Sequence, residues 1–332
     1  MGDQNTEPID VVAVGDIYLS RTYPKTAFDQ VKEAFDTADL VLGNLESTLT
    51  TNENQKFLYP WASLTSTPEM AAGLDCFDAL SLANNHGMDC GTEGLLETIE
   101  VVTAEGVEVV GAGENLESAT RAATFSIGGT DISILAFEAT QWSWPKMRAT
   151  SDRAGMNVVP VSPFYPDPKV SEYGLEQYHD HIESVASETD ILLVMLHSGI
   201  AGDHTIATHQ RALAERAVEA GADAVLGAHP HILQPVRVYD GVPIVYSLSN
   251  FVFDSPSFDF PRETVMVRLE IEGASITGVE LYPVYINESG QPTLPSPESE
   301  SFDSVAELLT SLSERVGTTL QRNSDHLRVP VR

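Results

Sequence analysis

Residues 9–16 read IDVVAVGD, an apolar run that ends in a glycine and an aspartate. The valines and the isoleucine favour a buried strand, and Gly15-Asp16 marks its end. Similar short apolar runs lie further along the chain, at residues 40–42, 79–82, 108–110, 132–137, 191–196, 224–226 and 244–246. Patterns typical of helices separate several of them, at residues 26–37, 94–105, 175–186 and 209–220. Alternating strands and helices predict a layered α/β fold.

The C-terminal part of the chain has a different pattern. Residues 265–271 and 275–281 predict a hairpin, and a Pro/Ser/Glu-rich linker at 289–301 precedes an amphipathic helix at 304–320. We therefore expect one domain over residues 1–288 and a linker with a helical extension over residues 289–332. Between residues 141 and 174 the chain is rich in Pro, Trp, Tyr and Asp and has no clear period. This stretch is longer than an ordinary connection, which favours a functional lid or rim.

The composition is strongly acidic, with 18 basic and 49 acidic residues in 332 and a formal net charge of −31. Such a surface repels nucleic acid and anionic membranes, so we expect neither as a partner. A hydrophobic content of 42% argues against disorder. Acidic residues are spread along the whole chain, and we interpret them as the solvated surface of a halophilic protein. The sequence has no apolar run of 18 residues, no signal-peptide pattern and only two cysteines, which together predict a cytoplasmic location.

Side chains that can bind a metal recur directly after the predicted strands. They are Asp16, Glu46, Asn85, His197, His229 and His231. In α/β sheets the carboxyl ends of the strands form the rim where ligands bind. Carboxylate, imidazole and amide oxygen together suit a divalent ion such as Mn, Fe, Zn or Mg. The pattern indicates a metal site at this rim.

Each of these residues also has a purely structural interpretation. Gly-Asp after a strand is commonly a turn, and Asn44-Leu45-Glu46-Ser47 could cap a helix, because the same four residue types recur at 115–118, where a helical pattern runs from Glu117 to Ala123. The motif His229-Pro230-His231 is harder to explain in this way. Pro230 biases His229 toward extended backbone, in which alternate side chains project the same way. The motif therefore predicts a rigid two-histidine clip.

Several motifs carry a resemblance through their order and spacing. They are Gly15-Asp16, Asn44-Leu45-Glu46, Asn84-Asn85-His86 with Asp89, Gly111-Ala112-Gly113, His197, Gly227-Ala228-His229-Pro230-His231 and Tyr246-Ser247-Leu248-Ser249-Asn250-Phe251. Over roughly residues 9–285 the chain resembles the CapA (poly-gamma-glutamate biosynthesis) family. That family is similar to calcineurin-like metallophosphoesterases, so the resemblance implies a four-layer α/β/β/α sandwich with a two-metal site.

The resemblance also implies a role for each matching residue. Asp16 and His231 would hold a first metal, Glu46 would bridge, and Asn85, His197 and His229 would hold a second. Related enzymes usually carry a histidine two residues after the first aspartate, where this chain has Tyr18, so we expect the first metal to bind more weakly. His86 would protonate the leaving group, Asp89 would orient it, and Arg21 would clamp an anionic substrate.

The implied activity is hydrolysis of an anionic small-molecule or polymer substrate, a phosphoester or a related compound, by a water that two divalent metal ions activate. The chain lacks the motifs of rival chemistries, such as Gly-x-Ser-x-Gly or a Walker loop. Two alternatives stay open: synthesis or processing of a poly-gamma-glutamate polymer, and a non-catalytic metal- or ligand-binding protein on the same scaffold. His204 and His209, downstream of His197, are expected to face solvent.

Overall fold

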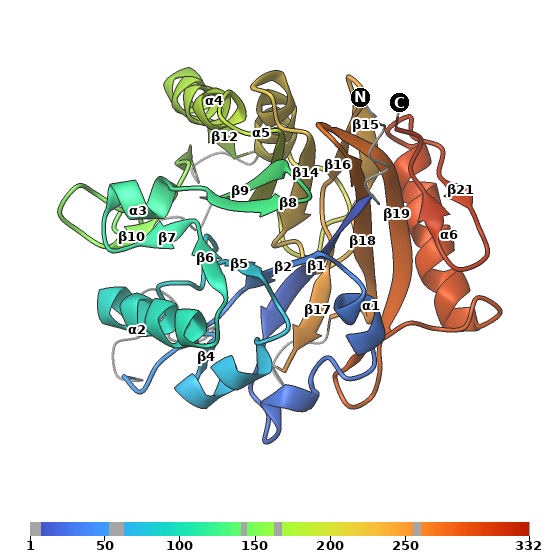
Figure 1. Ribbon diagram of the computed structural model, residues 1–332, viewed down its shortest axis with the longest axis horizontal. Coiled ribbons are helices and arrows are strands. Elements are labelled where there is room, and N and C mark those ends of the chain that lie inside the picture. Colours follow the sequence, from blue (N-terminus) through green and yellow to red (C-terminus); the bar gives the residue numbers. More distant parts are fainter. Residues whose placement is uncertain (1–7, 53–62, 141–144, 163–167, 255–259, 332) are drawn as a thin grey trace.

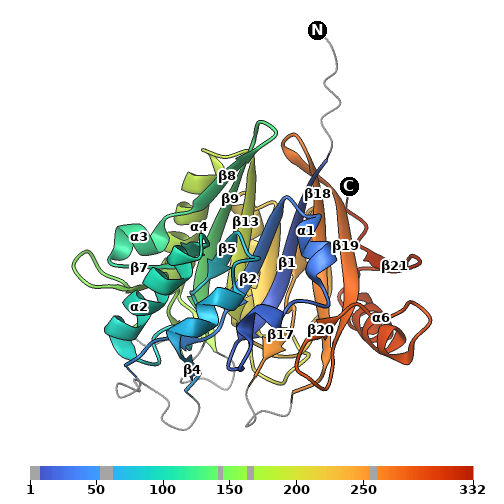
Figure 2. The same cartoon turned by 60° about the horizontal axis from the view of Figure 1, so that its bottom comes forward.

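The computed structural model describes residues 8–52, 63–140, 145–162, 168–254 and 260–331. Two mixed β-sheets pack face to face, as Figure 1 and Figure 2 show. Across the first sheet lie, in order, β21 (Gln321–Arg322), β22 (Leu327–Arg328), β19 (Ser275–Ile286), β18 (Glu263–Glu272), β1 (Ile9–Tyr18), β2 (Leu40–Leu45), β5 (Ala79–Ser81) and β6 (Glu108–Val110). In addition, β17 (Asn250–Phe253) pairs with β1, and β20 (Pro292–Thr293) pairs with β19. Across the second sheet lie β15 (Val236–Tyr239), β16 (Val242–Val245), β14 (Ala224–Ala228), β13 (Ile191–Ser198), β9 (Thr130–Ala139) and β8 (Ala123–Ile127).

Both sheets combine a run of parallel strands with antiparallel strands, which lie on one side of the first sheet and at both edges of the second. In the first sheet β1, β2, β5 and β6 are parallel, and in the second β9, β13, β14 and β16 are parallel. β18 continues the first sheet antiparallel to β1, while β8 and β15 border the second sheet in the same way. The parallel strands are the ones that the apolar runs predicted. Their side-by-side packing explains how residues far apart in sequence reach one rim.

Alternating burial along these strands produces three apolar layers. In β1, Val11 lies in the core between the two sheets, whereas Val12 faces the helices outside the first sheet. In β13, Leu193 lies in the same inter-sheet core, whereas Val194 faces the helices outside the second sheet. A strand that is buried on both faces reads as a continuous apolar run, as these two do. The expected α/β sandwich of four layers is confirmed.

Helices cover the outer sides of both sheets (Figure 1). Outside the first sheet lie α1 (Lys32–Asp36) and α2 (Gly91–Ala104) with the 3-10 turns η1 (Pro24–Thr26) and η2 (Pro68–Gly73), and outside the second lie α4 (Glu172–Ala186) and α5 (Thr208–Glu219). The helix predicted over 26–37 is reduced to α1, because the chain turns in 3-10 geometry first. A helical pattern also reached Ala123, but α3 (Leu116–Thr120) ends earlier and Ala123 begins β8.

The C-terminal helix α6 (Glu300–Glu314) is part of the sandwich. Its residues Phe302, Val305 and Leu309 are buried in the same core cluster as Val11 of β1. The helix contacts β18, β19 and β15, so it closes the open edge between the two sheets. Residues 289–332 therefore contribute core to the fold that residues 1–288 begin.

The stretch expected to form a lid or rim lies over the carboxyl end of β9. Short strands order it: β10 (Gly155–Met156) pairs with β7 (Ala112–Gly113), and β11 (Val161–Ser162) pairs with β12 (Lys169–Val170). A bridge between Glu138 and Val158 joins the stretch to β9. Elsewhere β3 (Thr48–Leu49) pairs with β4 (Thr65–Ser66). Residues 141–144 and 163–167 lie outside the described residues, including the aromatic residues Trp142, Trp144 and Tyr165.

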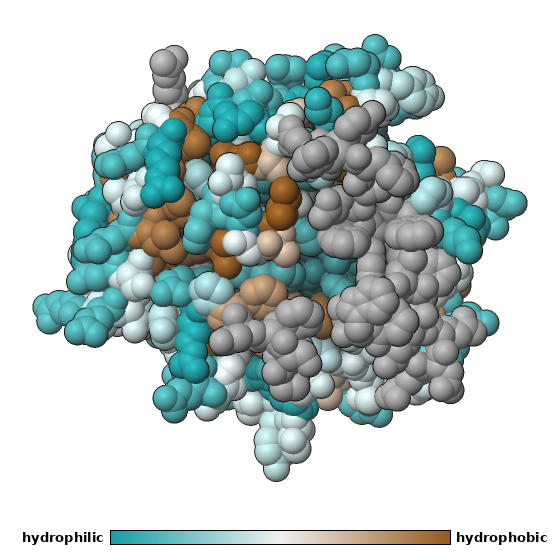
Figure 3. All heavy atoms as spheres, turned by 180° about the vertical axis from the view of Figure 1, so that it is seen from behind, coloured by the Kyte–Doolittle hydropathy of each residue, from teal (hydrophilic) through white to brown (hydrophobic). Residues whose placement is uncertain are grey.

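The surface is mostly polar. On the coloured part of the face opposite to that in Figure 1, Figure 3 shows mainly hydrophilic residues, with smaller apolar patches between them. Within the described ranges, no helix combines the length and the apolar character that crossing a bilayer requires.

Candidate metal centre

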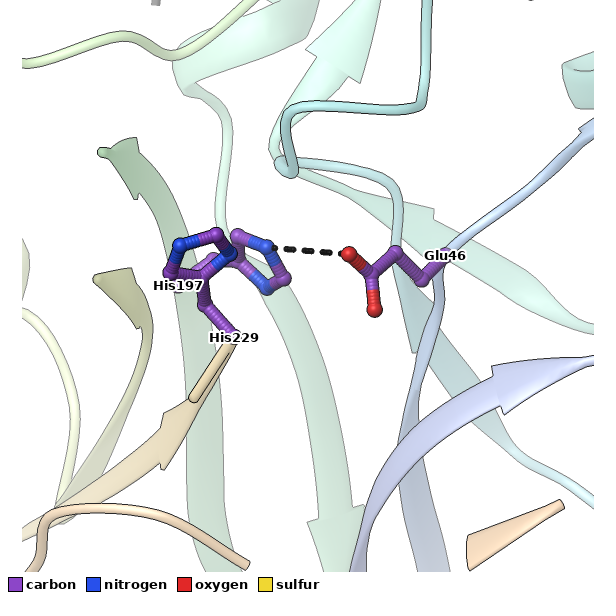
Figure 4. Close-up of side chains that lie close together, drawn as sticks. All are labelled: Glu46, His197 and His229. Atoms are coloured by element: carbon purple, nitrogen blue, oxygen red, sulfur yellow. Dashed lines mark ion pairs between the residues drawn. The ribbon is translucent and has the colours of Figure 1, made fainter. Parts of the chain in front are cut away.

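Two carboxylates from the first sheet meet three histidines from the second. Asp16 lies near the end of β1, and Glu46 directly follows β2. His197 lies in β13, and His229 and His231 directly follow β14. Figure 4 shows the carboxylate of Glu46 pointing toward the imidazole rings of His197 and His229. All five side chains are buried, with exposures of 6% or less.

These side chains form two groups that can each hold an ion. One group is Glu46, His197 and His229, and the other is Asp16, Glu46 and His231; in each, the ligand atoms lie within 4.8 Å of one another. Glu46 is common to both, with its Oε1 at 3.5 Å from His197 Nε2 and 3.7 Å from His231 Nε2. Oδ1 of Asn85, in the loop after β5, lies 2.7 Å from His197 Nε2. The structure thus brings the six sequence-predicted ligand residues together at one rim.

The hydrogen bonding of these groups fits a divalent ion. No described side chain hydrogen-bonds to either oxygen of Glu46 or to either ring nitrogen of His229, although all four atoms are buried. A hydrogen bond between the carboxyl groups of Asp16 and Glu46 requires that one of these two groups carries a proton. A buried carboxylate or imidazole without a partner costs free energy, and a coordinated cation would satisfy both. The donor set of carboxylate oxygens and imidazole nitrogens suits Mn, Fe or Zn.

The pKa values of the ligands show the same need for positive charge. Burial raises the pKa of Asp16 to about 7, although the hydrogen bonds that it accepts from Asn44 and from the amide of His229 act to lower this pKa. Burial, followed by the charge of Asp16, raises the pKa of Glu46 well above its ordinary value. Burial also lowers the pKa of His231 to about 4 and that of His197 and His229 well below the usual range. The imidazoles are therefore neutral, which is the form that binds metals.

Two asparagines hold the ligands in place. Nδ2 of Asn44 donates to Asp16 Oδ1 at 2.8 Å and lies 3.2 Å from His197 Nδ1, so it links the two sheets. Oδ1 of Asn250 lies 2.8 Å from His231 Nδ1. Because an amide oxygen accepts, Nδ1 of His231 carries the proton, and Nε2 is the atom available to an ion.

The backbone at this rim is tightly packed and partly strained. A Cβ on Gly15 would lie closer than 3.0 Å to the carbonyl oxygen of Ser249, which accepts the amide of Asp16 at 3.0 Å. A Cβ on Gly227 would similarly overlap the carbonyl oxygen of Tyr246. Glycine is therefore required at both positions, because only a residue without a side chain allows these strand ends to approach.

The prediction of extended backbone at His229-Pro230-His231 is wrong. β14 ends at Ala228, and φ is 96° at His229 and 58° at His231, in the left-handed region. The chain turns here because the amide of His229 donates to Asp16 Oδ2 at 3.1 Å. Both imidazoles still face the site, with ring centroids 5.8 Å apart. Positive φ at non-glycine residues is costly and clusters at functional sites.

His86 and Asp89 form a pair beside the ligand groups. His86 Nδ1 lies 2.7 Å from Asp89 Oδ2, which also accepts the amide of Leu64 at 2.7 Å. His86 directly follows Asn85 in the chain, so the pair lies next to a predicted ligand. Tyr18, which was expected to leave the first metal with one ligand fewer, donates its hydroxyl to the carbonyl of Thr65 at 3.3 Å.

Arg21 does not serve as the expected substrate clamp. Its Nε donates to Asp254 Oδ2 at 2.8 Å, its Nη2 contacts the other oxygen of the same carboxylate, and Nη2 also donates to the carbonyl of Gly290 at 3.0 Å. The guanidinium is therefore used to fix two loops. Arginine binds carboxylates with two parallel hydrogen bonds, and Asp254 satisfies that geometry inside the protein.

Sequence reasoning missed one buried acid close to the ligand groups. Glu138 pairs in register with His197 across β9 and β13, and its charge helps to raise the pKa of Glu46. Its Oε1 accepts the amide and the hydroxyl of Thr140 at 3.0 and 2.6 Å. The signal was present, because Glu138 directly follows the apolar run 132–137. His209, expected in solvent, is also buried, at 1% exposure.

Comparisons with known proteins agree with the resemblance. A family model described as "Bacterial capsule synthesis protein PGA_cap" matches residues 10–255. The PGA biosynthesis protein CapA of Bacillus subtilis is 31% identical over 287 residues, which are 83% of this chain and 71% of that protein. The capsule biosynthesis protein CapA of Bacillus anthracis is 26% identical over 312 residues, 90% of this chain and 72% of that protein. With about three quarters of its length matched by the family model, including all of the second sheet, the chain belongs to the CapA, or PGA_cap, family of bacterial capsule synthesis proteins.

Proposed function

We propose that this chain is a metal-dependent hydrolase that uses two divalent ions on an anionic phosphoester or a related substrate. The observation that carries the proposal is the carboxylate of Glu46. It belongs to both ligand groups, is fully buried, and has no described hydrogen-bond donor at either oxygen. A carboxylate in such a place is stable when a cation neutralises it.

The chain's own residues would divide the work. Asp16, Glu46 and His231 would hold one ion, and Glu46, His197 and His229, with Asn85 beside them, would hold the other. Bound divalent ions lower the pKa of a water and stabilise negative charge that develops on the substrate. Asp89 accepts the Nδ1 proton of His86, so Nε2 of His86 is the atom that would deliver a proton to the leaving group.

We also propose that the protein works in concentrated salt. A net charge of −31 repels an anionic substrate in dilute buffer. At about 1 M salt the Debye length falls to roughly 3 Å, so the repulsion no longer reaches the site. The same charge supports the proposal that nucleic acids and anionic membranes are not partners.

A second candidate function is the synthesis or processing of a poly-glutamate capsule polymer. It is favoured by membership of the CapA family, whose members in two Bacillus species are named for PGA and capsule biosynthesis. The same ligand groups would then act on an amide bond or on a phosphorylated intermediate of the polymer. This candidate differs from the first in substrate, not in the ligands required.

The test combines metal analysis with turnover. The purified protein in high salt should bind two Mn²⁺ per chain and hydrolyse bis-p-nitrophenyl phosphate. Glu46→Gln should lose metal and turnover together, whereas the control Glu280→Gln, outside both ligand groups, should keep both. Full metal binding by Glu46→Gln would refute the shared-ligand site. Metal binding without phosphodiester turnover, but with cleavage of poly-gamma-glutamate, would favour the second candidate.

A further inference from the structure

A cavity of about 270 Å³ lies on the outer side of the second sheet, away from the metal centre. Residues from α3, α4, β9 and the stretch 148–160 line it; among them are Leu116, Phe137, Arg148, Tyr173, Tyr178 and His181. Phe137 and Glu138 are neighbours on β9 and face opposite ways, because Phe137 packs in the outer layer while Glu138 pairs with His197. The sheet therefore separates this cavity from the metal ligands.

The rim of the cavity carries exposed hydrophobic side chains and no described acidic residue. Four large hydrophobic side chains are exposed in the described part of the chain, and two of them line the cavity: Leu116 at 38% and Tyr173 at 70%. No aspartate or glutamate is among the described lining residues, although the chain has 49 acidic residues in 332. Exposed apolar side chains that gather around a hollow mark a binding site more often than isolated ones do.

Arg148 adds positive charge to this cavity. Among the described residues its guanidinium has no ion pair and no hydrogen bond, unlike Arg21, Arg237 and Arg268, which each pair with a carboxylate. An arginine that has no partner on so acidic a surface can bind an external anion with two parallel hydrogen bonds.

Aromatic rings form the floor. The ring of Phe137 packs edge-on against Tyr178 and His181, with centroids 4.6 and 5.5 Å away. Nε2 of His181 donates to the carbonyl of Thr120 at 2.9 Å. The hydroxyl of Tyr178 is buried and has no partner within the described ranges. Buried tyrosine hydroxyls normally find a hydrogen-bond partner, which a ligand could provide here.

We propose that this cavity is a second ligand site, for a small organic acid with an aromatic body. The carboxylate pairs with Arg148, and the ring of the ligand packs against Leu116, Tyr173 and the aromatic floor. Aromatic ligands fit because three of the lining side chains are themselves aromatic rings of Phe or Tyr, which favour edge-to-face and offset stacking. The site is independent of the proposed hydrolase activity, since it shares no residue with the two ligand groups.

The experiment measures the affinity of 3-phenylpropionate by titration calorimetry, beside its neutral amide and beside propionate, which lacks the ring. The wild type should prefer 3-phenylpropionate over both by about fivefold or more. In Arg148→Gln the preference for the acid over the amide should fall to about one. Arg121→Gln removes the same charge just after α3 and outside the lining, so it should keep the preference. Tyr178→Phe keeps the aromatic ring of the floor and removes only the hydroxyl, so it should preserve the preference for the ring-bearing probes over propionate.

Three results would overturn the proposal. They are the absence of measurable binding to the folded wild type, an unchanged preference in Arg148→Gln, and an equal loss in Arg121→Gln, which would show that overall charge rather than the cavity attracts the acid. Because the readout is a ratio of affinities within one variant, a modest change in stability does not affect it.

Discussion

Gly15→Ala should damage the fold and the metal centre together, because the new methyl group meets backbone. Its Cβ would lie closer than 3.0 Å to the carbonyl oxygen of Ser249, and that oxygen accepts the amide of Asp16 at 3.0 Å. The next residue on that segment, Asn250, holds His231 through Nδ1. Moving β1 away from residue 249 therefore separates Asp16 from His231, which now lie 3.5 Å apart at Oδ2 and Nδ1.

The expected loss of stability follows from two contributions. Overpacking at a site that cannot move costs about 1–3 kcal/mol, and a buried backbone hydrogen bond left unmade costs about 1–3 kcal/mol. The sum is about 2–5 kcal/mol after the small gain of replacing a strand glycine by alanine. A chain of 332 residues has an unfolding entropy of roughly 0.7 kcal/mol/K, so the melting temperature should fall by about 3–7 °C.

Gly278→Ala provides a matched control. Its Cβ would also meet an atom closer than 3.0 Å, but that atom is the end of the flexible Glu270 side chain, which can move away. We expect Gly278→Ala to melt within about 1 °C of the wild type. Calorimetry gives the melting temperatures, and elemental analysis counts bound Mn²⁺. If Gly15→Ala has the melting temperature of the control and binds the full complement of metal, the close approach of Gly15 to Ser249 does not position the metal ligands.

Four further predictions concern other parts of the molecule. Metal-free protein should lose unfolding free energy as the pH rises through 7, measured by urea titration in chelator. The reason is that burial raises the pKa of Asp16 to about 7 and raises that of Glu46 well above its ordinary value, so the folded chain keeps protons that the unfolded chain, with carboxyl pKa values near 4, has released; a flat profile would contradict this. His86→Asn should lower kcat on the phosphodiester about 100-fold with metal content unchanged, and loss of metal instead would make His86 a ligand. Leu309→Ala in α6 should cost about 2–5 kcal/mol by chemical denaturation, as expected of a fully buried leucine, whereas less than 1 kcal/mol would mean that α6 is a loose appendage. Raising KCl from about 0.1 to 2 M should increase the melting temperature, because the net charge of −31 repels itself at low salt, and a decrease would argue against a halophilic surface.

The fold could be predicted from the sequence wherever a strand is buried on both sides. The runs 9–14, 132–137 and 191–196 are apolar apart from Asp10 and Ser133, and each forms a central strand of one of the two sheets. Local propensity failed where tertiary pairing decides the structure. Ala123 reads as the end of a helix, but it pairs with Ile134 in β9, and that ladder determines its conformation.

The position of the site was predictable for the same reason, but its details were not. The ligand residues lie at the ends of parallel strands, and parallel strands end at one rim. Asp16, Glu46 and His197 are therefore expected to lie close together once the two sheets pack face to face. Arg21 could not be placed from sequence, because its partner Asp254 is 233 residues away. The Asn-Leu-Glu-Ser motif caps a helix in only one of its two copies. Asn115 caps α3 through Ser118, whereas Glu46 of the other copy is buried.

The division of the ligands between the sheets has a consequence for how an ion would act on the fold. The first sheet supplies the carboxylates of Asp16 and Glu46, and the second supplies the three imidazoles. Each ligand group contains donors from both sheets, so an ion in either group would join them. Without an ion, the sheets are held at this end mainly by polar contacts such as those of Asn44 with Asp16 and His197. Ion binding and sheet packing are therefore coupled, and the apolar core between the sheets determines how far apart the ligands lie.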